Sequence, residues 1–169
     1  MKAVIPLVLA IAWHLPLHAA DALPSYLTGV WGTAESLDTG TAAQSFLHLA
    51  ADGYGFAVGS GPVKRMDGKD GGGDDGKQLP RPVIGFPVRA MLDGDLLTLL
   101  PYWPGKIDEA QAARQVLSCR YDASAPALNC TTVNGVAIRL QRRAEQLDAE
   151  TAKQIEAVRS PPPFTLSGR

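Results

Sequence analysis

The chain lacks an excess of charge of either sign, since 16 lysines and arginines are matched by 17 aspartates and glutamates among its 169 residues. Proteins that bind nucleic acid through its phosphates carry a basic excess. We therefore expect no nucleic-acid partner. The sequence is also poor in histidine, with three, and in cysteine, with two. Both shortages limit the metal and nucleophile chemistry that the chain can support.

Long hydrophobic runs are missing as well, apart from one short stretch near the N-terminus. Residues 3–13 carry no charge, follow a basic start and precede an Ala-x-Ala cleavage pattern that ends at Ala22. This pattern is typical of a secretory signal peptide, and the stretch is shorter than the roughly 20 residues that span a bilayer. We predict that residues 1–22 are removed, with a cut after Ala20 as the alternative. The mature chain is then periplasmic or secreted and has no membrane anchor.

The two cysteines, Cys119 and Cys130, both lie in apolar runs flanked by turn residues. In an exported protein such a pair is oxidised, so we predict a disulfide between them. The pair has no imidazole partners for a metal site, because His14 and His18 belong to the predicted signal peptide and His48 alone remains. We expect neither a metal nor another cofactor.

Catalytic motifs are scarce. His48 would have to activate any serine nucleophile, such as Ser45, Ser60 or Ser118, and no Gly-x-Ser-x-Gly elbow surrounds these serines. The aspartates of residues 67–75 lie in a glycine-rich stretch without the spacing of a calcium loop. We therefore expect that the protein is not an enzyme, and a small hydrolase is the third hypothesis.

Turn-forming dipeptides divide the mature chain into hairpins. Asp52-Gly53, Asp93-Gly94 and Asn134-Gly135 each lie between apolar runs, which is the strongest short-range hairpin signal. A two-residue loop at the first turn pairs Leu49 with Phe56, and the same loop length at the second pairs Ala90 with Leu97. The predicted fold is all-β and antiparallel.

The third turn is constrained by the predicted disulfide. If Cys119 faces Cys130, a two-residue turn would send the next strand's apolar residues to the wrong face of the sheet. A three-residue loop over 133–135, with Gly135 left-handed, restores one apolar face and pairs Cys130 with Ile138. We predict an inward-facing disulfide on a three-stranded meander, with strands at 116–121, 127–132 and 136–142.

Side chains expected to point inward are mostly large. They include Phe56, Tyr121 and the pair Ile84 and Phe86, and their size favours a filled interior. Residues 59–82, rich in glycine, aspartate and lysine, predict a mobile loop. Residues 144–158 predict a helix, and the proline-rich residues 160–169 a flexible tail.

A short motif on the first expected strand resembles a known family. Leu27-Thr28-Gly29-Val30-Trp31 is similar to the opening motif of the lipocalin-like (calycin) barrels. The resemblance implies an up-and-down β-barrel with one C-terminal α-helix, over residues 23–159. It also implies that Trp31 plugs the closed end beneath a basic residue of the last strand, for which Arg142 or Arg143 fits better than Arg139. A β-sandwich is the alternative fold.

We predict an exported, non-enzymatic β-barrel binding module that binds a protein partner or a small apolar ligand. Tyr102 and Trp103, an aromatic pair between two prolines, are the possible contact residues near the barrel mouth. The alternative is a periplasmic inhibitor or immunity protein that acts on a secreted protease or toxin. Barrels that inhibit secreted metalloproteases resemble this chain in a short stretch before Leu-x-Gly-x-Trp. Here residues 21–26 would enter a partner's cleft.

Overall fold

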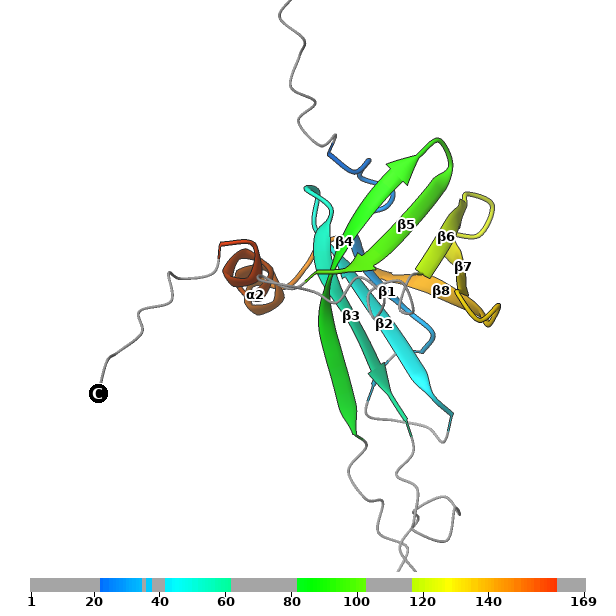
Figure 1. Ribbon diagram of the computed structural model, residues 1–169, viewed down its shortest axis with the longest axis horizontal. Helices are drawn as coiled ribbons and strands as arrows, with labels where there is room; N and C mark the ends of the chain where they lie inside the picture. The colour runs from blue at the N-terminus through cyan, green and yellow to red at the C-terminus, as the bar shows by residue number, and fades with distance from the viewer. Residues whose placement is uncertain (1–21, 35, 38–41, 62–81, 103–116, 161–169) are drawn as a thin grey trace, which may run out of the picture.

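The structure, a computed structural model, describes residues 22–34, 36–37, 42–61, 82–102 and 117–160 (Figure 1). The predicted signal peptide up to residue 21, Trp103 and the tail from residue 161 lie outside this part. The elements of the described part are β1 (Gly29–Gly32), β2 (Gln44–Leu49), β3 (Tyr54–Ser60), β4 (Val83–Asp93), β5 (Leu96–Pro101), β6 (Leu117–Asp122), β7 (Ala127–Thr132), β8 (Ala137–Ala144) and α2 (Ala149–Arg159).

The strands form a closed barrel in which each strand pairs with its sequence neighbours and β8 returns to β1. All pairs are antiparallel, and closure removes the exposed sheet edges that would otherwise invite aggregation. Helix α2 lies outside the barrel beside β3 (Figure 1). The predicted fold class is confirmed, and the β-sandwich alternative is wrong.

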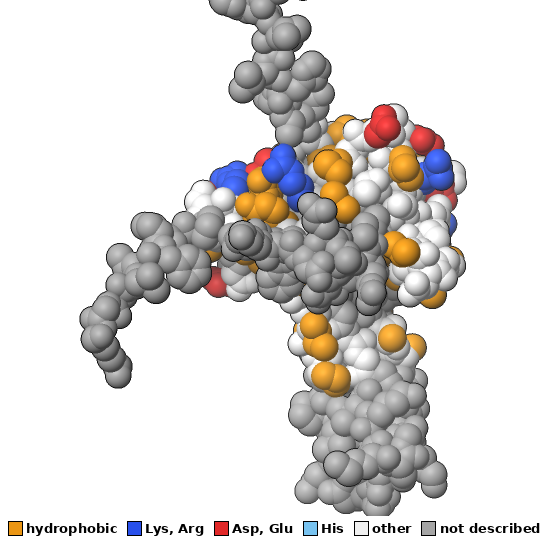
Figure 2. All heavy atoms as spheres, in the orientation of Figure 1, with side chains coloured by type: hydrophobic (Ala, Val, Ile, Leu, Met, Phe, Trp, Pro, Cys, Tyr) orange, Lys and Arg blue, Asp and Glu red, His pale blue; other side chains and the backbone are white. Residues whose placement is uncertain are grey.

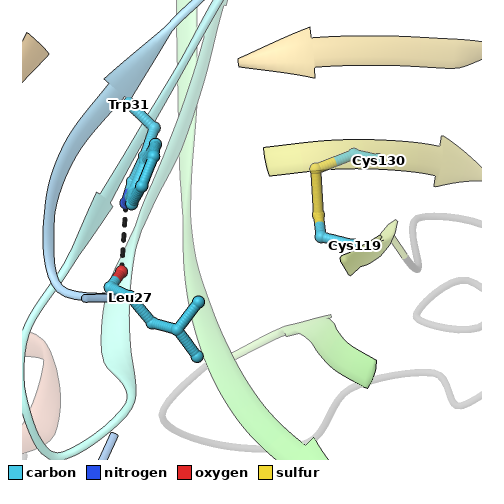
Figure 3. Close-up of a disulfide and its surroundings, with 4 residues drawn as sticks. All are labelled: Leu27, Trp31, Cys119 and Cys130. Atoms are coloured by element: carbon cyan, nitrogen blue, oxygen red, sulfur yellow. Dashed lines mark hydrogen bonds between the residues drawn. A yellow bond between two sulfur atoms is a disulfide. The ribbon is translucent and has the colours of Figure 1, made fainter. Parts of the chain in front are cut away.

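The β6–β7–β8 meander has the predicted register. Cys119 pairs with Cys130, which pairs in turn with Ile138. The disulfide is present, and both cysteines are buried in the core (Figure 3). Thr132 N–H donates to the Val136 carbonyl across the three-residue loop, and Gly135 has a φ of 78°. The predicted disulfide therefore led to the correct three-residue loop between β7 and β8.

The predicted register of the β2–β3 hairpin is wrong by one residue. Leu49 pairs with Gly55 instead of Phe56, because the loop has three residues and ends at Gly53, whose φ is 82°. Ala50 N–H donates to the Tyr54 carbonyl at 2.9 Å, as in the β7–β8 turn. A one-residue shift reverses the faces of a strand, so Phe56 points outward and not into the interior.

The β4–β5 register differs from the prediction by two residues. Ala90 pairs with Leu99 instead of Leu97, because the two-residue loop is Gly94-Asp95. Gly94 has positive φ at the first loop position, as a type II′ turn requires. A two-residue shift leaves each side chain on its predicted face, and Ala90, Leu97 and Leu99 are all buried.

Helix α2 begins later than predicted because β8 continues as far as Ala144. Asp148 is the N-cap residue and accepts a hydrogen bond from Thr151 N–H at 2.8 Å, which satisfies a free backbone donor of the first turn. Ile155 is the buried residue of the helix. Gly59 and Ser60 belong to β3, so the predicted loop over 59–82 begins too early. Within the described residues, no helix is long and apolar enough to cross a bilayer.

Candidate functional site

One end of the barrel is plugged by the segment that precedes β1. Leu23 and Leu27 are buried in the core cluster, and Leu23 N–H donates to the Ala51 carbonyl at 2.7 Å. Trp31 is fully buried, and its indole N–H donates to the Leu27 carbonyl at 3.0 Å (Figure 3). Leu23 therefore belongs to the plug and is not available to a partner, whereas Ser25 and Tyr26 of the same segment are exposed. The expectation that residues 21–26 enter a partner's cleft stays a prediction.

Arg142 lies over Trp31 at this closed end. The guanidinium carbon is 4.2 Å from the indole centroid, within the range of a cation–π interaction. The same guanidinium donates to the carbonyls of Thr28, at 2.9 Å, and Tyr26. Arg143 instead donates to the Gly32 carbonyl at 3.3 Å. The arrangement ties the plug segment to the last strand.

The opposite end of the barrel is hollow. A cavity of about 250 Å³ lies inside this end, where β2, β4, β6 and β8 begin. Its polar side chains are those of Ser45 and Thr132, and Thr132 Oγ1 accepts a hydrogen bond from Val136 N–H at 3.1 Å. The lining consists of Ser45, Phe46, Leu47, Ala57, Val58, Gly59, Phe86, Val88, Leu99, Leu117, Thr132, Ile138 and Leu140.

The register of β3 is what leaves this space open. Ala57 pairs with Leu47 and with Phe86, both of which pack in or against the core, so Ala57 and Gly59 take the inward positions. In the predicted register Phe56 would have filled the same wall. The expectation of an interior filled by large side chains is therefore wrong at this end.

Tyr102 lies on the outer wall of the barrel, away from the cavity. Its ring meets that of Tyr54 edge to face, with 5.0 Å between centroids. Tyr54 in turn accepts a hydrogen bond from Arg89 at 2.6 Å, and the guanidinium lies 4.8 Å from its ring centroid. The expected position of Tyr102 near the barrel mouth is wrong, and its role as a contact residue stays a prediction. Alternation from the inward Leu99 could have placed it outside.

A second hollow lies on the closed end, near Tyr26, Tyr121 and Arg142. Tyr26 and Tyr121 stack there with centroids 4.9 Å apart. The Arg142 guanidinium is already engaged by the backbone carbonyls of the plug and by Trp31. These contacts serve closure of the barrel, so we take the open-end cavity as the candidate site.

His48 faces outward on β2, as predicted. Its Nδ1 atom is buried and has no hydrogen-bond partner within the described residues. Ser45 lines the cavity and Ser60 Oγ donates to the Leu37 carbonyl at 2.6 Å, so neither forms a nucleophile pair with Nδ1. Burial lowers the pKa of His48 below 6.5, and the nearby Asp148 carboxylate opposes this effect.

We expect the stability of the protein to fall as the pH is lowered from about 7 to about 5. The unfolded chain titrates with a histidine pKa of about 6.5, whereas the folded pKa is lower, so protons bind preferentially to the unfolded state in this window. Urea unfolding at both pH values measures the loss. The pKa values of Asp122 and Asp148 are held below 3.8 by hydrogen bonds, so these groups act at lower pH. In a His48→Leu variant the free energy of unfolding should be the same at both pH values. If the variant keeps the full wild-type difference between the two pH values, another group is responsible.

Comparison with known proteins adds one similar structure. No family model and no curated protein matches the chain. Among solved structures, a lipoprotein YedD from Klebsiella pneumoniae subsp. pneumoniae MGH 78578 is similar, with a TM-score of 0.44 and 14% identity. The match covers 86% of this chain and 94% of that chain. The strand pairing described above establishes the barrel without this similarity.

Proposed function

We propose that the protein is an exported, non-enzymatic barrel of the lipocalin-like type that holds a small apolar ligand in the open-end cavity. The observation that carries this proposal is the contrast between the two ends of one barrel. Trp31 and Leu27 fill the closed end, whereas the inward residues Ala57 and Gly59 leave about 250 Å³ at the other. A concave, mostly apolar space with a few polar groups is the usual form of a small-molecule site.

The cavity limits the size and polarity of the ligand. An engineered cavity of about 150 Å³ binds benzene, so by proportion 250 Å³ accommodates about ten carbon atoms. The described residues that line the cavity include no charged side chain, so an ionised group beside them would lack a counter-charge. The ligand is therefore uncharged in the part that enters, with hydroxyls available from Ser45 and Thr132.

The disulfide supports the exported location. Disulfides persist in oxidising compartments and are rare in the cytosol of most organisms. The buried Cys119–Cys130 bond thus agrees with the signal peptide predicted over residues 1–22, and it favours a periplasmic or secreted protein.

Naphthalene, with its ten carbons, is a suitable probe for the cavity. We expect it to bind the mature protein and to shift the methyl NMR signals of Leu99, Leu117 and Ile138. An Ala57→Leu variant places a larger side chain in the cavity and should weaken binding by about ten-fold or more, since it displaces buried apolar contacts. Ala137→Leu is the matched control, because the same change there lies on the exposed outer face. No shift in the wild-type protein, or equal losses in the two variants, would contradict the proposal.

A protein partner is the second candidate, and it is favoured by the outer-wall cluster of Tyr54, Arg89 and Tyr102. Within the described residues, Arg89 forms no ion pair and contacts the tyrosines of this cluster. Tyrosine and arginine are the side chains most enriched at interface hot spots. Native mass spectrometry of the protein from its own source separates the candidates. A small retained mass supports the ligand, and a complex abolished by Arg89→Ala supports the partner.

A further inference from the structure

The apolar lining of the cavity continues beyond its mouth. Ile84 pairs with the lining residue Gly59, and strand alternation places it on the same face as Phe86. Its side chain is nevertheless 72% exposed, because β4 extends past the end of the barrel. Val136 lies directly before β8, where continued alternation places it on the face of Ile138, and it is 58% exposed. Two aliphatic side chains of the inner face thus stand in solvent at the mouth.

The exposed hydrophobic side chains of the described residues gather at this end. Ile84 has Val83 beside it, and Val136 has Val133 across the β7–β8 turn, whereas Tyr26 and Met91 lie elsewhere. Strands β4 and β8 are four strands apart in the closed barrel, so the two pairs flank the mouth from opposite walls. Figure 2 shows hydrophobic side chains on the lower part of the surface, where β3 and β4 project in Figure 1.

The described residues of this end also carry no charge. No aspartate, glutamate, lysine or arginine occurs in its described segments, which are 42–45, 59–61, 82–85 and 131–137. The closed end differs, since Arg159 pairs there with Asp52 and Arg142 lies over the plug. Placing the open end against an apolar phase therefore desolvates no ionised group of these segments.

We propose that the open end docks on the surface of a lipid bilayer, with Ile84 and Val136 inserted beside the mouth. This proposal rests on the proposed function, because a ligand that suits the cavity is more soluble in a bilayer than in water. A flat apolar surface can cover both walls of the mouth and supply the ligand at the same time. A protein segment lying across Ile84 and Val136 would instead block the mouth.

Flotation with vesicles of palmitoyl-oleoyl phosphatidylcholine tests the docking face on the mature protein. The wild type should float with the vesicles, equally at about 0.15 M and about 0.5 M salt, because screening does not weaken apolar contacts. An Ile84→Asp/Val136→Asp variant should partition onto the vesicles at least about ten-fold less than the wild type, since both inserted side chains become charged. Met91→Asp is the matched control on the outer face of the same strand, where the side chain is 48% exposed, and it should float like the wild type.

Several results would overturn the proposal. They are a wild type that does not float, an equal loss in Met91→Asp, or a salt-sensitive attachment that survives the Ile84→Asp/Val136→Asp change. A concentration-dependent dimer that the double variant abolishes would identify a second copy of the chain as the occupant. An Ile84→Ser/Val136→Ser variant repeats the test without added charge. Naphthalene titration without vesicles reports the cavity separately, so flotation without naphthalene binding would support docking and reject the ligand site.

Discussion

Replacing Trp31 with alanine is expected to lower the free energy of unfolding by about 4 kcal/mol, the largest effect of any single substitution in the barrel. Trp31 is fully buried at the closed end, and its removal leaves a cavity that the closed strands cannot collapse to fill. The substitution also removes the donor to the Leu27 carbonyl and the ring beneath Arg142. Urea unfolding followed by circular dichroism measures the loss.

A Trp31→Phe variant serves as the control for this prediction. It keeps an aromatic ring under Arg142 but lacks the indole N–H, so it should lose clearly less than the alanine variant. Arg142→Leu, combined with each Trp31 variant, isolates the cation–π contact, for which a coupling of about 1 kcal/mol is expected. A loss below about 1.5 kcal/mol in Trp31→Ala would mean that Leu23 and Leu27 close the barrel without the tryptophan.

The sequence alone predicted the strand register well where a covalent bond constrained it. The predicted disulfide between Cys119 and Cys130 fixed which face of β6 and β7 points inward, and that choice required a three-residue turn ending at Gly135. The same turn ends at Gly53, but nothing in the sequence there excludes a two-residue loop. Turn residues predict where a hairpin lies in the sequence, whereas a second constraint is needed to predict its register.

The open cavity could not be predicted for the same reason. In β3, small residues at positions 55, 57 and 59 alternate with larger ones, and the usual rule turns the larger ones inward. Phe56 in fact faces outward and is half-buried, on a wall that has α2 beside it. An outer helix gives both faces of a strand apolar neighbours, so hydrophobicity no longer identifies the inner face.

The plug segment, by contrast, has a signal in the sequence for packing on the barrel. Leu23 and Leu27 are four residues apart on either side of a turn that contains Pro24 and Ser25, and both are buried. Two leucines at this spacing just before Trp31 favour a helical turn packed on the barrel over a free N-terminal arm. The resemblance suggested a stretch that enters a partner's cleft, whereas the spacing of the two leucines indicates which of its side chains pack on the barrel instead.

Replacing both Cys119 and Cys130 with alanine is expected to lower the free energy of unfolding by about 3 kcal/mol, and the melting temperature by about 10 °C. The two cysteines are 11 residues apart, and opening this short loop frees the unfolded chain. The wild type treated with a reductant should match the double alanine variant to within about 1 kcal/mol, and the reductant should not affect the variant itself. If the loss is under about 1 kcal/mol, the β6–β7 hairpin persists in the unfolded chain, since a hairpin formed there already restricts the loop that the disulfide closes. The same comparison, run with naphthalene, tests whether the bond also shapes the cavity, because Ile138 pairs with Cys130 and lines it.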